Sequence, residues 1–114
     1  MTYTLLDIAA LDHDGDTAEF QGVQHGGARV SIILVDVPPG GGPKLHRHPY
    51  EEVFIVQEGR ASYTVGTETL DAHAGQMVIV PAGTPHKFTN SGDCPLRQVD
   101  IHVSERFITE WLEE

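Results

Sequence analysis

The sequence predicts an all-β domain, built as a β-sandwich, a jelly roll or a small barrel. Glycine and proline divide the 114 residues into short pieces, and most of these pieces are rich in Val, Ile, Thr, Tyr and Phe, which favour strands. The pieces follow one another at near-regular spacing without a linker or an internal repeat, which is typical of sandwiches and barrels. The length fits one domain, so we expect residues 1–114 to form a single unit.

Nine segments carry the strand signal. Gly59 separates the fourth segment from the fifth, and Gly66-Thr67 separates the fifth from the sixth, each as a hairpin turn. In chain order the expected strands are Tyr3–Leu6, Phe20–Val23, Arg29–Val37, Val53–Gln57, Ala61–Val65, Glu68–Leu70, Met77–Val80, His86–Thr89 and Arg97–Val103.

The end of the chain predicts a short C-terminal helix. Ser104 can cap a helix that runs from residue 105 to about Leu112, in which Phe107 and Trp111 are spaced i, i+4. Ile108 and Leu112 have the same i, i+4 spacing. We expect the resulting apolar stripe to dock on the barrel or on a second subunit.

Composition excludes several classes of partner. The chain carries 17 acidic and 7 basic residues, a formal net charge of −10, so a nucleic-acid-binding surface is not expected. No apolar run approaches the roughly 18 residues of a membrane helix, and the N-terminal stretch lacks a basic leader. The single cysteine, Cys94, fits a reducing compartment. We therefore expect a soluble, cytoplasmic protein.

Two clusters resemble ligand loops only in composition. The run Gly40–Lys44 lacks the Lys-Ser/Thr ending of a phosphate loop and is followed by no expected helix. Asp12, Asp14 and Asp16 alternate as in a calcium loop, but the glycine and the final glutamate of such a loop are missing. We interpret the first as a flexible loop and the second as a solvated turn.

The seven histidines are the unusual feature of this composition. His46, His48 and Glu52 have the same parity, so in an extended segment all three side chains lie on one face. His86 follows the rigid turn 81–85 and would bring a fourth ligand from across the barrel. Three imidazoles and a carboxylate suit one divalent transition metal: Fe, Mn, Ni, Zn, Co or Cu. The alternative is that the four are ordinary polar residues at strand ends.

The same residues form two motifs. The first, Gly-x5-His-x-His-x3-Glu-x6-Gly, is present as Gly40, His46, His48, Glu52 and Gly59, over residues 40–59. The second, Gly-x5-Pro-x-Gly-x2-His-x3-Asn, is present as Gly75, Pro81, Gly83, His86 and Asn90, over residues 75–90. With all ten positions matched, the chain resembles the cupin superfamily, as a small single-domain member.

The resemblance implies a fold and a site. The fold would be a double-stranded β-helix, a jelly-roll barrel with a metal inside near one mouth and commonly paired as a homodimer. The metal ligands would be His46, His48, Glu52 and His86. Gly59 and Gly83 would occupy turns with positive φ, whereas Gly40 and Gly75 would begin strands.

The alternation of side chains along the strands predicts further residues of the barrel wall beside the site. From Glu52 it places Phe54 and Val56 inside, and from His86 it places Phe88 inside. Tyr63 and Met77 are further candidates for the wall, although ordinary core packing also explains them. His13, His25 and His73 are expected in surface turns and loops.

The strand Arg97–Val103 alternates between an apolar face and a polar face. We favour the apolar face inside, which leaves Asp100 and His102 in solvent or at a subunit contact. The alternative places Asp100 and His102 beside the metal, as catalytic acid and base or as supports for the ligands.

Three functions are compatible with these residues. The preferred one is a metalloenzyme acting on a small oxygen-bearing metabolite, of the dioxygenase, isomerase, decarboxylase or lyase type. The alternative is a non-catalytic barrel that binds or senses a small ligand or a metal. A purely structural barrel is disfavoured because all four candidate ligands are present.

Overall fold

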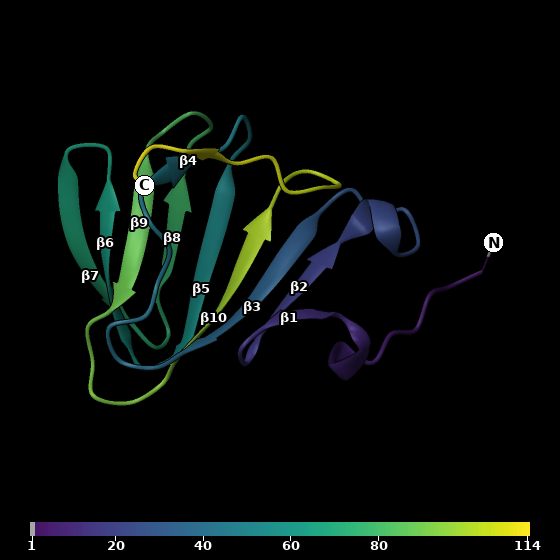
Figure 1. Ribbon diagram of the computed structural model, residues 1–114, viewed down its shortest axis with the longest axis horizontal. Coiled ribbons are helices and arrows are strands. Elements are labelled where there is room, and N and C mark those ends of the chain that lie inside the picture. Colours follow the sequence, from purple (N-terminus) through teal and green to yellow (C-terminus); the bar gives the residue numbers. More distant parts are fainter. Residues whose placement is uncertain (1) are drawn as a thin grey trace.

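The computed structural model describes residues 2–114 and consists of two antiparallel sheets packed face to face, which confirms the all-β prediction (Figure 1). The sheets contain β1 (Asp12–Asp14), β2 (Thr17–Gln21), β3 (Ser31–Val37), β4 (His46–Arg47), β5 (Glu52–Glu58), β6 (Arg60–Val65), β7 (Glu68–His73), β8 (Met77–Val80), β9 (His86–Asn90), β10 (Leu96–His102) and β11 (Glu110–Trp111). The helical content of the described chain is two single 3-10 turns, Ile8–Ala10 and Gly22–Gln24.

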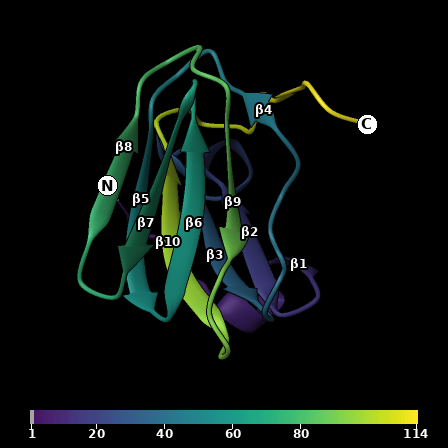
Figure 2. The same cartoon turned by 90° about the vertical axis from the view of Figure 1, so that its left-hand side faces the viewer.

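The two sheets differ in length. Sheet A has the order β1-β2-β3-β10-β5-β8, and sheet B has the order β11-β4-β9-β6-β7. Sheet B covers one half of sheet A, and the β1–β2–β3 end of sheet A extends beyond it (Figure 1). In Figure 2, β6, β7 and β9 lie in front of β5, β10 and β3. This overlap leaves a partly open space between the sheets.

The closed half of that space is the hydrophobic core. Phe54, Tyr63 and Leu96 are almost fully buried there, and the rings of Phe54 and Tyr63 pack edge to face with their centroids 5.3 Å apart. Phe88 packs against both rings at 5.9 Å. Phe54, Val56 and Phe88 therefore lie inside, as parity predicts. Met77 is 58% exposed, so its suggested place in the wall is wrong.

The glycines of the two motifs lie in tight turns. Gly59 has a φ of 85°, and a Cβ there would lie 2.8 Å from the carbonyl oxygen of Pro95. Gly83 has a φ of 79°, and its N–H donates to the carbonyl of His48 at 2.7 Å. Gly40 and Gly75 also have positive φ and lie in turns, so the expectation that they begin strands is wrong.

The expected C-terminal helix is absent from the described chain, and residues 104–113 instead bend at 104–106 and run across the rim of the sandwich (Figure 1). We call residues 104–113 the strap. Its strand β11 pairs with β4, and the N–H of Leu112 donates to the carbonyl of Leu45 at 2.9 Å. An isolated helix of about eight residues is only marginally stable, whereas the open edge of β4 offers backbone partners.

Two further details differ from the sequence prediction. Tyr3–Leu6 forms no strand, because it has no neighbouring strand to pair with. The short strands β1, β4 and β11 were not expected from the sequence; each has only two or three residues. Among residues 2–114 there is no helix long and apolar enough to cross a membrane.

Candidate metal centre

Three strands bring four candidate ligands together inside the sandwich. His46 and His48 come from and just after β4, Glu52 begins β5, and His86 begins β9. One donor atom from each lies within 4.8 Å of every other, and all four residues are buried. The structure thus brings together the three residues that the period-two spacing places on one face and His86, which follows the turn 81–85.

Backbone pairing fixes the positions of these side chains. His46 lies directly opposite His86 in the pairing of β4 with β9, so both rings project from the same face of sheet B. Their centroids are 4.4 Å apart. Glu52 reaches them from sheet A, on the opposite wall. The site therefore bridges the two sheets.

Each of the three candidate ligand histidines is oriented by a backbone carbonyl. The Nδ1 atoms of His46, His48 and His86 lie 2.7, 2.9 and 2.9 Å from the carbonyl oxygens of Lys44, Ile108 and Thr84. A carbonyl oxygen only accepts, so each Nδ1 carries the proton and donates it. In the neutral imidazole, the lone pair is then on Nε2.

The Nε2 atoms of His48 and His86 lie 3.1 and 3.0 Å from the same Glu52 oxygen, Oε1. Lone pairs facing a carboxylate oxygen repel one another unless a cation lies between them or an imidazole is protonated. The Nε2 of His48 is buried and has no hydrogen-bond partner among the described residues. Two ligands bound at right angles, each about 2.1 Å from a metal, are about 3.0 Å apart, so the observed spacing fits a transition metal.

The electrostatics of the group favour the deprotonated forms of two candidate ligands. Burial, with His86 and His48 adding to it, lowers the pKa of His46 to about 4. Burial alone would raise the pKa of Glu52, but hydrogen bonding with His102, the largest of the opposing contributions, holds it below its ordinary value. His46 is therefore neutral and Glu52 ionised at neutral pH, as metal binding requires.

A fourth imidazole completes the environment of Glu52. His102, the last residue of β10, places Nε2 3.0 Å from the second carboxylate oxygen, Oε2. Its Nδ1 lies 2.6 Å from the hydroxyl of Tyr50, which in turn lies 3.4 Å from the N–H of Ile108. When the Tyr50 hydroxyl accepts from that N–H and donates to Nδ1, the proton of His102 is on Nε2, facing Glu52.

A second polar chain lies further inside. The Tyr63 hydroxyl donates to Oε1 of Gln98 at 2.5 Å, which fixes the amide orientation. Nε2 of Gln98 then donates to Oδ1 of Asp100 at 2.9 Å. Asp100 is 2% exposed, and burial, together with the charge of Glu52, raises its pKa well above the ordinary value. The carboxyl of Asp100 thus holds its proton more firmly than an exposed carboxyl does, and its Oδ1 accepts a hydrogen bond.

A cavity of about 690 Å³ opens beside the ligands and is lined by Glu52, Asp100 and His102. Its apolar wall comes from both sheets and the strap: Ile33, Val35, Phe54, Phe88, Phe107 and Trp111. Acidic residues 14, 16, 19 and 36 also line it. Among the described residues that line it there is no Lys or Arg.

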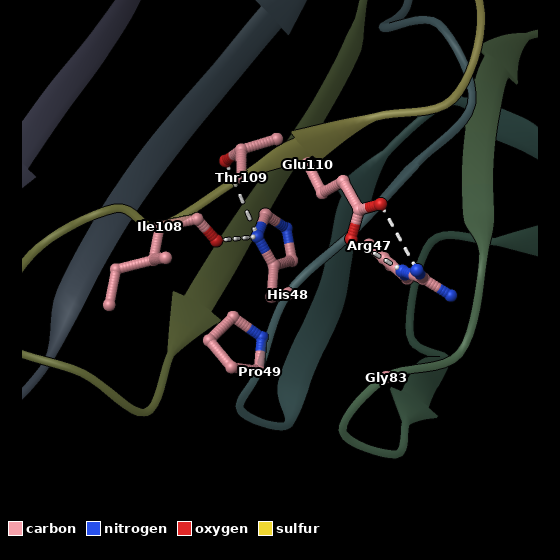
Figure 3. Close-up of a pocket in the computed structure, with 7 residues that line it drawn as sticks. All are labelled: Arg47, His48, Pro49, Gly83, Ile108, Thr109 and Glu110. Atoms are coloured by element: carbon pink, nitrogen blue, oxygen red, sulfur yellow. Dashed lines mark hydrogen bonds and ion pairs between the residues drawn. The ribbon is translucent and has the colours of Figure 1, made fainter.

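The strap packs against the outer side of the candidate metal centre. Figure 3 shows the carbonyl of Ile108 and the hydroxyl of Thr109 beside Nδ1 of His48, and Arg47 paired with Glu110. These groups border a shallower surface pocket of about 340 Å³. On the inner side, the ring of Trp111 lies 5.1 Å from that of His46. The strap therefore orients one candidate ligand, His48, and packs against another, His46.

The favoured orientation of β10 is wrong. Gln98, Asp100 and His102 face the interior, where Asp100 and His102 line the cavity, and the apolar residues Val99 and Ile101 face outward. The alternative orientation, with Asp100 and His102 beside the ligands, is the one observed. His13 and His73 are exposed, and His25 stacks on Phe20 with centroids 5.6 Å apart, all away from the centre.

Comparison with known proteins identifies the family. A family model described as a cupin domain matches residues 33–102, more than half of the chain. The chain belongs to the cupin family. The matched region ends at His102, so the strap lies outside it.

Two curated relatives match this cupin over only part of their own length. An uncharacterised protein of Methanocaldococcus jannaschii is 35% identical over 72 residues, which cover 62% of this cupin and 58% of that protein. Auxin-binding protein 4 of Zea mays is 31% identical over 90 residues, covering 70% of this cupin and 44% of the relative. The matches thus span about half of each relative.

Among solved structures, oxalate decarboxylase of Bacillus subtilis, a protein with Mn(II) centres, superposes with a TM-score of 0.77 at 26% identity. The match covers 84% of this cupin and 27% of that chain. This similarity confirms the jelly-roll architecture that the two motifs imply.

Proposed function

We propose that this cupin is a metal-dependent enzyme that acts on a small oxygen-bearing metabolite. The observation that carries the proposal is the convergence of the His48 and His86 Nε2 atoms on one oxygen of Glu52, at 3.1 and 3.0 Å. With each Nδ1 proton committed to a backbone carbonyl, this arrangement is stable with a cation at its centre.

One divalent transition metal would be held by His46, His48, Glu52 and His86. The mixed nitrogen and oxygen set suits Mn, Fe, Co, Ni, Cu and Zn. Mn is the first candidate, because Bacillus subtilis oxalate decarboxylase, which shares the fold, has Mn(II) centres. When bound, the metal would act as a Lewis acid toward a substrate oxygen.

The lining of the cavity selects the class of substrate. A divalent ion together with ionised Glu52 leaves one net positive charge, and no Lys or Arg among the described lining residues adds another. A dianion such as a dicarboxylate would lack a second counter-charge. The apolar wall at Phe54, Phe88 and Trp111 fits a carbon body. We therefore propose a neutral or singly charged 2-oxo acid, hydroxy ketone or phenol.

Residues of the chain would supply proton transfer and orientation. Because Gln98 donates to Oδ1 of Asp100, the acid proton is on Oδ2, from which it can pass to a substrate oxygen in the cavity. His102 touches Glu52 and acts as a positioning residue for that ligand. Phe107 and Trp111 on the strap limit access of water.

The test is a turnover screen of protein prepared without a His tag and loaded with Mn or Fe. Candidate 2-oxo acids, hydroxy ketones and phenols are compared with dicarboxylates, with oxygen uptake and product formation as readouts. His86→Ala is expected to abolish turnover. Asp100→Asn is expected to keep the metal and lower kcat about 10²-fold or more, as loss of an acid catalyst does.

Asp71→Asn provides the matched control, because Asp71 is exposed on β7, outside the site. It should leave kcat unchanged. Equal turnover by His86→Ala and the wild type would contradict a metal-dependent mechanism, and equal kcat for Asp100→Asn would remove Asp100 from it.

The second candidate function is a binding barrel without chemistry. It is favoured by the similarity to auxin-binding protein 4, a relative named for ligand binding, and by the apolar cavity wall. Stoichiometric binding of one small ligand to the metal-loaded protein, with no product from any compound screened, would select this function.

A further inference from the structure

Two aromatic residues of the strap pack on imidazoles of the candidate metal centre. Phe107 lies edge to face on His102, with the ring centroids 4.9 Å apart. The ring of Trp111 lies 5.1 Å from that of His46. These contacts come from outside the matched cupin domain, which ends at His102. The strap is therefore an addition to the domain that reaches its candidate ligands.

His48 differs from the other two candidate ligand histidines in the group that holds its Nδ1 proton. His46 and His86 each donate to a carbonyl oxygen two residues earlier in the chain, so both rings are fixed within their own turns. His48 donates to the carbonyl of Ile108, 60 residues later, at 2.9 Å. Only a docked strap therefore supplies the partner that keeps the lone pair of His48 on Nε2.

The N–H of the same strap residue acts on the other side of Glu52. It lies 3.4 Å from the hydroxyl of Tyr50, which lies 2.6 Å from Nδ1 of His102. His48 and His102 contact different oxygens of Glu52, at 3.1 and 3.0 Å. The peptide groups of Ile108 thus set the tautomers of both imidazoles that flank this carboxylate.

The strap is held to the sandwich by exposed contacts. None of residues 104–113 is buried. Besides the pairing of β11 with β4, Glu110 pairs with Arg47 at 2.8 Å. Glu113 accepts from the N–H of Leu45 at 2.8 Å and pairs with Lys87 at 3.3 Å. Exposed ion pairs stabilise little, and a segment with few buried contacts opens at low cost.

We propose that docking of the strap and binding of the metal stabilise each other through the peptide groups of Ile108. A bound ion needs the lone pair of His48 on Nε2, and the Ile108 carbonyl stabilises that tautomer only when the strap is docked. Metal binding therefore favours the docked strap, and a docked strap raises metal affinity by the same factor. The coupling rests on the metal centre of the proposed function and requires no particular reaction.

Amide exchange of the full chain measures the coupling from the side of the strap. Zn²⁺ is the probe, because it suits the ligand set and is diamagnetic. The amides of Phe107 and Leu112 donate to the sandwich when the strap is docked. Zn²⁺ is expected to slow their exchange about tenfold or more. In His86→Ala, which lacks a candidate ligand, Zn²⁺ should not change it.

Two double variants measure the coupling from the side of the metal. Glu110→Ala with Glu113→Ala removes side chains that attach the strap, and competition with a chelator is expected to show Zn²⁺ binding about fivefold weaker. Glu105→Ala with Glu114→Ala is the matched control for the lost charge. Glu105 pairs with Arg106 inside the strap, and Glu114 is exposed. This control should bind Zn²⁺ as the wild type does.

A peptide-to-ester replacement between Ile108 and Thr109 tests the positioning role itself. It weakens the Ile108 carbonyl as an acceptor and keeps every side chain. Zn²⁺ affinity is expected to fall about tenfold. Nitrogen NMR of the metal-free protein should show His48 changing from the Nδ1–H form to a mixture of tautomers, which a role in covering the interior alone would not cause. An ester between Glu113 and Glu114 should change neither.

Circular dichroism checks that each variant is folded, and Glu110→Gln with Glu113→Gln replaces the alanine pair if that pair does not fold. Equal Zn²⁺ affinity of the two esters, with one His48 tautomer in both, would overturn the coupling and leave the metal centre in place. A wild type that binds no Zn²⁺ would overturn the coupling and the metal centre together. Coupling without turnover of any substrate would contradict the proposed reaction alone.

Discussion

The hydroxyl of Tyr50 lies 2.6 Å from Nδ1 of His102, and this contact fixes the tautomer in which Nε2 of His102 carries the proton and faces the carboxylate of Glu52. Neither Tyr50 nor His102 belongs to the proposed ligand set. Together they hold the second oxygen of Glu52 while its first oxygen faces His48 and His86.

Tyr50→Phe removes the hydroxyl and keeps the ring that stacks on His48. His102 then loses the donor that fixes its tautomer, and Glu52 is held less firmly. We expect metal affinity to fall about tenfold to 100-fold, the usual effect of losing a group that orients a ligand. Competition with a chelator measures it. Tyr3→Phe, at an 89% exposed position, should behave as the wild type.

His86→Ala removes the one ligand that comes from the second motif. We expect metal content, measured by mass spectrometry on untagged protein, to fall from about one ion per chain to less than about a tenth of that. His73→Ala is the matched control, because His73 is exposed at the end of β7. Full occupancy of His86→Ala would show that the ion is bound by other residues.

Trp111 reports on the site directly. It is the single tryptophan of the chain, and its ring lies 5.1 Å from that of His46. Binding of a paramagnetic ion such as Mn²⁺ should therefore quench its fluorescence, with saturation at one equivalent. The same titration of His86→Ala should leave the emission unchanged. Quenching of equal size in both proteins would contradict the assignment.

The stability of the metal-free protein should depend on pH through His46. Its pKa is about 4 in the fold, compared with an ordinary value of 6.5, chiefly because it is buried. Between these values the unfolded chain binds a proton that the folded chain does not, so stability falls as pH decreases from 6.5 toward 4. We expect a loss of about 2 kcal/mol from this residue.

Urea unfolding at pH 6.5 and 4.5 measures this effect. His46→Gln should reduce the difference between the two pH values by about 2 kcal/mol. His13→Gln, at an exposed position, should retain it. The same pH dependence in His46→Gln and the wild type would show that other groups cause it.

Sequence spacing predicted the grouping of the candidate ligands, because backbone parity places His46, His48 and Glu52 and a motif turn places His86. The short strand β4, which carries His46, was not predicted. Parity also explains where prediction failed. It divides β10 into two faces but does not say which one is inside, and here Asp100 and His102 take the inner position while Val99 and Ile101 face outward.

The helix predicted for the strap is wrong for a related reason. Phe107 and Trp111 are four residues apart, a spacing that fits one face of a helix and one face of a strand equally well. Pairing with β4 stabilises the strand. Phe107, Thr109 and Trp111 all line the cavity. Tyr50 could have been found, since it has the same even parity as His46, His48 and Glu52.

Crystals grown with Mn²⁺ and measured at its absorption edge test the central claim most directly. We predict one anomalous peak per chain, about 2.0–2.2 Å from the Nε2 atoms of His46, His48 and His86 and from an oxygen of Glu52. No peak at this position at saturating metal, or a peak only elsewhere on the molecule, would contradict the metal centre on which the proposed function depends.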